Sequence, residues 1–125
     1  MGEKENLELA ERVWSNWSST DFTVLKDALA DGCIQEWPQS GERIRGKENI
    51  IAISENYPGL PTTTVRRMTA GGNLVIGELT LDYGGKIYNG VSILEIAGGK
   101  IVHEIDYFAE PFEAPAWRAQ WVERM

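Results

Sequence analysis

Three pairs of adjacent glycines in the second half of the chain constrain its fold more than any other feature. They are Gly71-Gly72, Gly84-Gly85 and Gly98-Gly99, and each lies between two stretches that alternate between apolar and polar residues. Glycine accepts the positive φ angles that tight hairpin turns require. The pattern therefore predicts an antiparallel meander of four long strands. Their expected ranges are 61–68, 74–83, 86–96 and 100–109.

The first half of the chain changes to helical periodicity. Residues 5–18 are expected to form a helix whose apolar stripe consists of Leu7, Ala10, Val13, Trp14 and Trp17. The other expected elements are a break at 18–20, a helix from the N-cap Asp21 to Asp31, a short strand over 33–38, a polar loop over 39–46 and a helix over 47–56. Helices followed by strands indicate one α+β domain over residues 1–125. We expect a strongly curved antiparallel sheet, the meander plus the short strand, with three helices on its concave face.

The last segment, residues 115–124, is predicted to form a short helix. It carries Trp117 and Trp121 four positions apart, on one helix face. We expect these two rings to clamp the C-terminal tail onto the sheet.

Composition excludes several classes of function. Twelve basic residues against nineteen acidic ones give a net charge of −7, which disfavours nucleic acid as a partner. Cys33 is the only cysteine and His103 the only histidine, so neither an intrachain disulfide nor a transition-metal site is expected. The charged start of the chain has no apolar run behind it, so we expect no signal peptide, no membrane segment and a cytoplasmic location.

The last predicted strand carries the residues best suited to chemistry. Alternation places Glu104, Asp106 and Phe108 on one face, and Ile101, His103, Ile105 and Tyr107 on the other. The first face combines two carboxyl groups with an aromatic ring. We therefore expect it to line a pocket, with His103 facing away from Asp106.

Four motifs together resemble the nuclear transport factor 2-like superfamily, and within it the SnoaL-like, polyketide cyclase-like branch. They are Asp21-Phe-Thr-Val-Leu, Glu36-Trp-Pro, Ile44-Arg-Gly-Lys-Glu-Asn-Ile50 and Gly99-Lys-Ile-Val-His-Glu-Ile-Asp-Tyr-Phe108. The resemblance implies a conical α+β barrel with an apolar pocket and a homodimer through the outer sheet face. Enzymes and non-catalytic binding modules both use this fold, so function has to be argued from the site.

Two enzyme mechanisms known from the superfamily lack their residues here. Ketosteroid isomerases use a tyrosine and two aspartates at positions that correspond to Val13, Trp37 and Ser92. Limonene-epoxide hydrolases use an Arg-x-Asp pair where this chain has Leu79-Thr80-Leu81, and of their three residues only the aspartate on the last strand has a counterpart, Asp106. A third resemblance remains, because SnoaL-type cyclases use an aspartate near the position of Asp106 as acid and base for an aldol ring closure.

Asp106 is therefore the candidate catalytic residue. The residues expected around a bound ligand are Val13, Trp17, Trp37, Leu79, Leu81, Ser92, Glu104 and Phe108. Burial in such a pocket, beside a second carboxyl group, raises the pKa of a carboxylic acid toward the range useful for proton transfer. The alternative is that Asp106 accepts hydrogen bonds that hold the end of the barrel together.

Two functional hypotheses follow. In the first, the protein binds a small hydrophobic molecule and, with Asp106 as general acid and base, isomerises or cyclises it without a cofactor. In the second, it is a non-catalytic dimeric ligand-binding or interaction module. Val91, Ile93, Ile105 and Tyr107 would form the apolar stripe between the two copies. Arg66 and Arg67 are expected on opposite strand faces, so that one of them faces the pocket side.

Overall fold

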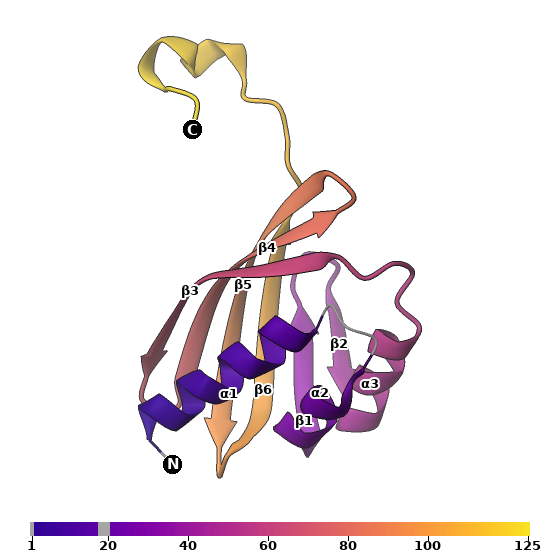
Figure 1. The fold of residues 1–125 in the computed structure, drawn as a ribbon. Coiled ribbons are helices and arrows are strands. Elements are labelled where there is room, and N and C mark those ends of the chain that lie inside the picture. The colour runs from indigo at the N-terminus through magenta and orange to yellow at the C-terminus, as the bar shows by residue number, and fades with distance from the viewer. Residues whose placement is uncertain (1, 18–20) are drawn as a thin grey trace.

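The computed structural model describes residues 2–17 and 21–125 and contains a single six-stranded sheet with helices over one face (Figure 1). The elements in chain order are α1 (Glu3–Asn16), α2 (Thr23–Ala28), β1 (Leu29–Trp37), β2 (Glu42–Arg45), α3 (Lys47–Glu55), β3 (Thr62–Gly71), β4 (Leu74–Tyr83), β5 (Lys86–Ala97), β6 (Lys100–Ala109) and the 3₁₀ helix η1 (Ala116–Trp121). The expected break at 18–20 lies outside the described residues. The α+β class is confirmed.

The predicted meander is confirmed. Strands β3 to β6 pair in order as antiparallel neighbours within the sheet order β2-β1-β6-β5-β4-β3. Gly84 and Gly85, between β4 and β5, have φ angles of 69° and 104°, a conformation that side chains disfavour. The sheet curves like a cone but does not close. It is also not wholly antiparallel, because β1 runs parallel to β6.

The helices cover the concave face and enclose the core. Helix α1 packs across β3 and β4, and α3 packs on β1. The core consists of buried apolar side chains from both layers, among them Ala10, Leu29, Val75 and Ile101. This packing leaves the pocket-forming face of β6 beneath the helices.

The structure corrects the predicted boundaries around the first strand. Helix α2 ends at Ala28, and β1 begins at Leu29 instead of Cys33. The expected polar loop over 39–46 contains β2, an edge strand that pairs with β1. Only one of its four residues, Ile44, is buried, so its sequence lacks an alternating apolar pattern long enough to reveal a strand.

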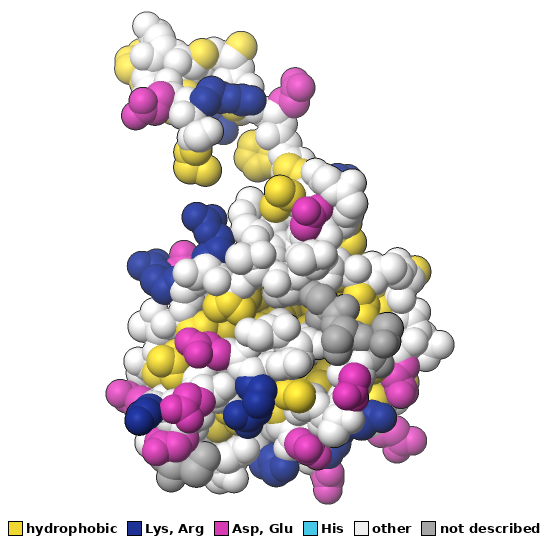
Figure 2. Space-filling view, in the orientation of Figure 1, with side chains coloured by type: hydrophobic (Ala, Val, Ile, Leu, Met, Phe, Trp, Pro, Cys, Tyr) yellow, Lys and Arg dark blue, Asp and Glu magenta, His cyan; other side chains and the backbone are white. Residues whose placement is uncertain are grey.

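The predicted clamp by the two C-terminal tryptophans is wrong. The tail projects away from the sheet as a separate lobe with hydrophobic groups on its surface (Figures 1 and 2). Trp117 and Trp121 are 73% and 72% exposed, and the described contacts of η1 bury none of its residues. Spacing on one helix face predicted that these rings act together, but it contains no information on what they contact.

Two β-bulges change which residues share a face. In β6 the register shifts between Ile101 and His103, so Val102 is an extra residue and Ile101 lies on the buried side with Glu104 and Asp106. The expectation that Ile101 shares the face of His103 is therefore wrong. A bulge in β3 between Val65 and Arg67 likewise leaves Arg66 and Arg67 both exposed, instead of one facing the pocket side.

Candidate functional site

A cavity of about 300 Å³ lies between the helices and the concave face of β1 and β6. Its wall is mainly apolar and aromatic, with rings from α1, β1, β6 and the end of α3. The lining residues are Trp14, Trp17, Leu25, Gln35, Trp37, Gln39, Ser40, Ile50, Ile53, Ser54, Tyr57, Glu104, Asp106 and Phe108. Among the described residues, this lining includes no lysine, arginine or histidine, and its carboxyl groups are those of Glu104 and Asp106.

The two carboxyl groups on β6 are buried side by side. Glu104 and Asp106 are 5% and 1% exposed, because alternation along β6 points both toward the helices. Gln35 on β1 lies opposite Glu104 in the parallel register. Its side-chain Nε2 donates to Glu104 Oε2 at 2.8 Å and to Asp106 Oδ2 at 2.7 Å. One amide therefore holds both acids in place.

Burial and proximity change the pKa of both carboxyl groups. It raises the pKa of Glu104 well above its ordinary value, and the adjacent charge and hydrogen bond of Asp106 raise it further. Burial also raises the pKa of Asp106, while hydrogen bonds from Glu104, Ser92, Gln35 and Trp37 act in the opposite direction. These directions favour Glu104 as the member that holds a proton and Asp106 as the member that ionises first.

Ser92 connects the pair to helix α1. It lies directly opposite Asp106 in the register of β5 and β6. The indole Nε1 of Trp14 donates to Ser92 Oγ at 3.2 Å, which leaves the serine hydroxyl proton for Asp106. Trp14 thus contributes to the cavity wall and also, through Ser92, orients a donor at the carboxylate.

Two buried polar atoms at this site have no partner with hydrogen-bond geometry among the described residues. They are Asp106 Oδ1, an acceptor, and Trp37 Nε1, a donor. Such atoms are uncommon in folded proteins, and each normally calls for an explanation such as a bound molecule. The cavity wall therefore contains one acceptor and one donor that form no well-aligned hydrogen bond with the described residues.

The structure brings together five of the nine residues expected at the site. Trp17, Trp37, Glu104, Asp106 and Phe108 all line the cavity. The other four do not line it and are buried around it. These are Val13 in the helix–sheet core, Ser92 behind Asp106, and Leu79 and Leu81 on β4, which β5 separates from β6.

Sequence reasoning missed Gln35. The alternation of the strand could have identified it, because Gln35 stands two positions before Trp37 and therefore lies on the same face as Trp37. Gln39 and Ser40 lie in a turn without periodicity, and no pattern indicated that they reach the cavity.

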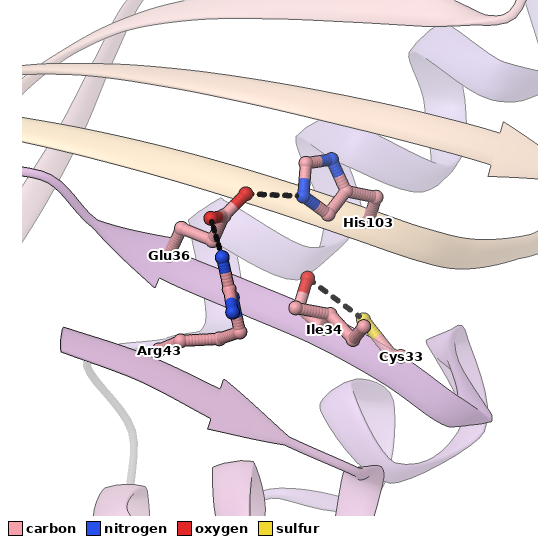
Figure 3. Close-up of polar contacts among 5 residues, drawn as sticks. All are labelled: Cys33, Ile34, Glu36, Arg43 and His103. Atoms are coloured by element: carbon pink, nitrogen blue, oxygen red, sulfur yellow. Dashed lines mark hydrogen bonds and ion pairs between the residues drawn. The ribbon is translucent and has the colours of Figure 1, made fainter.

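The outer face of the same strands carries a different cluster. His103 Nε2 lies 2.6 Å from Glu36 Oε1, and Arg43 Nη2 donates to Glu36 Oε2 at 3.3 Å (Figure 3). The pKa of Glu36 is lowered, first by its hydrogen bond with His103 and then by that with Arg43. His103 therefore pairs on the side of the sheet away from Asp106.

The model of the SnoaL-like domain family matches residues 10–104, which is most of the chain. This chain belongs to the SnoaL-like domain family. The predicted resemblance to the nuclear transport factor 2-like fold is confirmed with it. No protein of curated function matches the sequence.

Solved structures agree with this assignment. The SnoaL-like domain is 42% identical to an NTF2-like protein of unknown function from Burkholderia xenovorans, with a TM-score of 0.86 over 98% of this chain and 97% of that one. It is 28% identical to a Kribbella flavida protein provisionally assigned as a ketosteroid isomerase, with a TM-score of 0.90 over 98% and 91% of the two chains. An LEH-like epoxide hydrolase of M. tuberculosis, 24% identical, shares the fold with a TM-score of 0.73 over 85% and 84%.

Proposed function

We propose that this SnoaL-like domain binds a small, largely apolar molecule in its cavity and acts on it as a cofactor-independent isomerase or aldol cyclase. Asp106 is the general acid and base. The observation that carries the proposal is the unpartnered Asp106 Oδ1, a buried carboxylate oxygen that faces an aromatic-lined cavity. A carboxylate with a raised pKa, held away from water, can remove a proton from carbon next to a carbonyl group and return it elsewhere.

The remaining ionisable and nucleophilic groups fit this role less well. Burial raises the pKa of the Cys33 thiol to about 12, so it stays protonated and inert. His103 lies on the outer face with Glu36. The positions of the ketosteroid isomerase residues hold Val13, Trp37 and Ser92, and those of the epoxide hydrolase Arg-x-Asp pair hold Leu79-Thr80-Leu81, so the carboxyl groups of both pairs are missing.

A second candidate function is a non-catalytic ligand-binding module. It is supported by Gln35, whose hydrogen bonds to both acids connect β1 to β6 and give the carboxyl groups a structural task. In this case the acids orient a ligand or stabilise the end of the sheet, and no proton is transferred.

The two candidates are separated by an assay that needs no knowledge of the natural substrate. 2-Tetralone, a flat apolar ketone, is incubated with the protein in deuterated buffer, and loss of its α-proton NMR signal is followed. We expect exchange faster than in buffer alone, and a loss of roughly a hundredfold or more in Asp106→Asn with binding retained. Glu95→Gln, an exposed acid on β5, is the control. Binding without accelerated exchange in the wild type would favour the non-catalytic module.

We also propose a homodimer through the outer face of the sheet. Leu74, Ile76, Val91 and Tyr107 are each about two-fifths exposed there, at 42%, 42%, 39% and 43%. Ile76 pairs with Ile93, and Val91 with Tyr107, so apolar side chains of three neighbouring strands share this face, as is typical of an association site.

A further inference from the structure

Trp37 is the last residue of β1, and its ring forms part of the cavity wall. Its indole Nε1 is buried and unpartnered, although the ring lies beside Asp106 and counts among the donors that oppose the burial-driven rise in the pKa of that acid. The donor Trp37 Nε1 and the acceptor Asp106 Oδ1, neither of which has a well-aligned partner, therefore lie close together in the cavity wall.

We propose that Trp37 is a catalytic residue, and that its indole N–H holds the carbonyl oxygen of a ketone or aldehyde substrate while Asp106 Oδ1 removes a proton from the adjacent carbon. The proposal rests on the proposed function and names its substrate class. A carbonyl oxygen and the hydrogen on its α-carbon are close neighbours in one small molecule. A base and a donor that adjoin can therefore serve both at the same time.

The proton and the negative charge of the proposed step both stay within the cavity. The α-C–H bond breaks, its proton forms an O–H bond at Asp106 Oδ1, and its electron pair becomes the enolate double bond as the carbonyl π electrons move to oxygen. Before the step the acid pair carries one negative charge, and afterwards that charge resides on the enolate oxygen at Trp37 Nε1. The amount of buried charge does not change, and the indole N–H stabilises it where it develops. Isomerisation ends when Asp106 returns the proton to a different carbon.

Three other polar side chains of the lining already make hydrogen bonds within the protein. Gln35 Nε2 donates to both carboxyl groups, and the hydroxyl of Tyr57 lies 2.6 Å from that of Tyr83. Ser40 Oγ donates to the main-chain oxygen of Trp37 at 3.3 Å. Among the described residues, Trp37 Nε1 is the only buried side-chain donor atom without a hydrogen-bond partner.

The test uses two ligands of the same shape, benzophenone and diphenylmethane. Only benzophenone has a carbonyl group, and it has no α-hydrogen, so the test is independent of catalysis. We expect benzophenone to bind the wild type roughly three- to tenfold more tightly than diphenylmethane, as a single hydrogen bond implies. That preference should disappear in Trp37→Phe, which keeps an aromatic ring and removes the N–H. The Trp37 indole proton, assigned by its absence in the variant, should shift downfield with benzophenone alone.

Trp117→Phe, in the exposed tail, is the matched control and should behave as the wild type. In the 2-tetralone assay Trp37→Phe should slow exchange about a hundredfold and raise KM by no more than the three- to tenfold that the ground-state hydrogen bond contributes, as expected for a donor that acts mainly on a developing oxyanion. The proposal is overturned by an equal affinity for the two ligands in the wild type, by a preference that survives in Trp37→Phe, or by failure of both ligands to bind. Ketone preference through Trp37 without any exchange would instead contradict Asp106 as a base and leave Trp37 as a binding residue.

Discussion

Ser92 lies directly across from Asp106 in the antiparallel register of β5 and β6, and it passes the hydrogen bond of Trp14 on to that carboxylate. The pairing explains how an apolar cavity retains an ionised acid. Asp106 receives donors from two neighbouring strands, and from helix α1 by way of Ser92. Its Oδ2 accepts a hydrogen bond from Gln35, whereas its Oδ1 has no well-aligned donor among the described residues, and we propose that a ligand uses this second oxygen.

Replacing Ser92 tests this relay. Ser92→Ala removes a donor to Asp106 and leaves Trp14 Nε1 without its acceptor, so we expect a loss of about 1–3 kcal/mol of unfolding free energy in urea. It should also raise the pKa of Asp106, as measured from its carboxyl carbon-13 shift over a pH series. Ser15→Ala, at an exposed position of α1 outside the cavity lining, is the control. An unchanged pKa of Asp106 would mean that the serine hydroxyl does not reach it.

Glu104 should make the folded state less stable as pH rises. Its pKa is raised in the folded protein, so the folded state binds more protons than the unfolded state above the ordinary value of 4.5. Its stabilising contribution is complete below that pH and is lost as pH rises through the folded-state pKa, by at most about 1.4 kcal/mol per pH unit. In Glu104→Gln, which keeps a hydrogen-bonding side chain, the slope above pH 4.5 should become smaller and retain only the contribution of Asp106, whose pKa burial also raises.

The exposed Glu95→Gln variant should keep the wild-type slope. Chemical denaturation at several pH values measures all three proteins. A Glu104→Gln protein with the wild-type pH dependence would show that Glu104 is not the protonated member of the pair.

A charge in the outer face should dissociate the proposed dimer. Val91 and Tyr107 face each other across β5 and β6 and are both about two-fifths exposed, at 39% and 43%. We expect Val91→Lys to sediment as a monomer at micromolar concentration where the wild type sediments as a dimer, because it buries an unpaired charge in the interface. Glu95→Lys, at an exposed position on the same strand, controls for the change in net charge. A wild type that is already monomeric would rule the dimer out.

Removing the tail should leave the domain intact. The described contacts of η1 bury none of its residues, so deletion of residues 111–125 should change the unfolding free energy by no more than about 0.5 kcal/mol at concentrations where the protein is monomeric. A larger loss would mean that Trp117 and Trp121 pack against the sheet in solution. Urea denaturation followed by circular dichroism makes the comparison without relying on tryptophan fluorescence.

The sequence was most informative where the pattern was long. The four meander strands could be placed from their glycine turns, and Asp106 could be assigned to the inner face from alternation alone. The short edge strand β2 and the start of β1 were missed, since neither has enough residues to show a period. The hydrogen-bond partners of Glu104 and Asp106 were more difficult to predict, because the contact between Gln35 and β6 depends on a parallel pairing between segments far apart in the chain.

The wall of the cavity shows the same limit. Trp17, Trp37 and Phe108 were identified from the face they occupy on their own elements. Leu79 and Leu81 also face inward, but which part of the interior a strand reaches depends on the curvature of the sheet and its position in the strand order. Neither quantity is encoded in the residues of one strand.

The extra residue Val102 in β6 has a consequence for comparing homologues. An odd number of positions separates Ile101 from Asp106, so a regular strand would place them on opposite faces, yet the bulge turns both inward. A homologue without a counterpart of Val102 would have a regular strand in which the core residue and both acids still face the interior. A one-residue gap at this point of an alignment would therefore be neutral for the site, and the acids should be matched by counting back from the end of the strand.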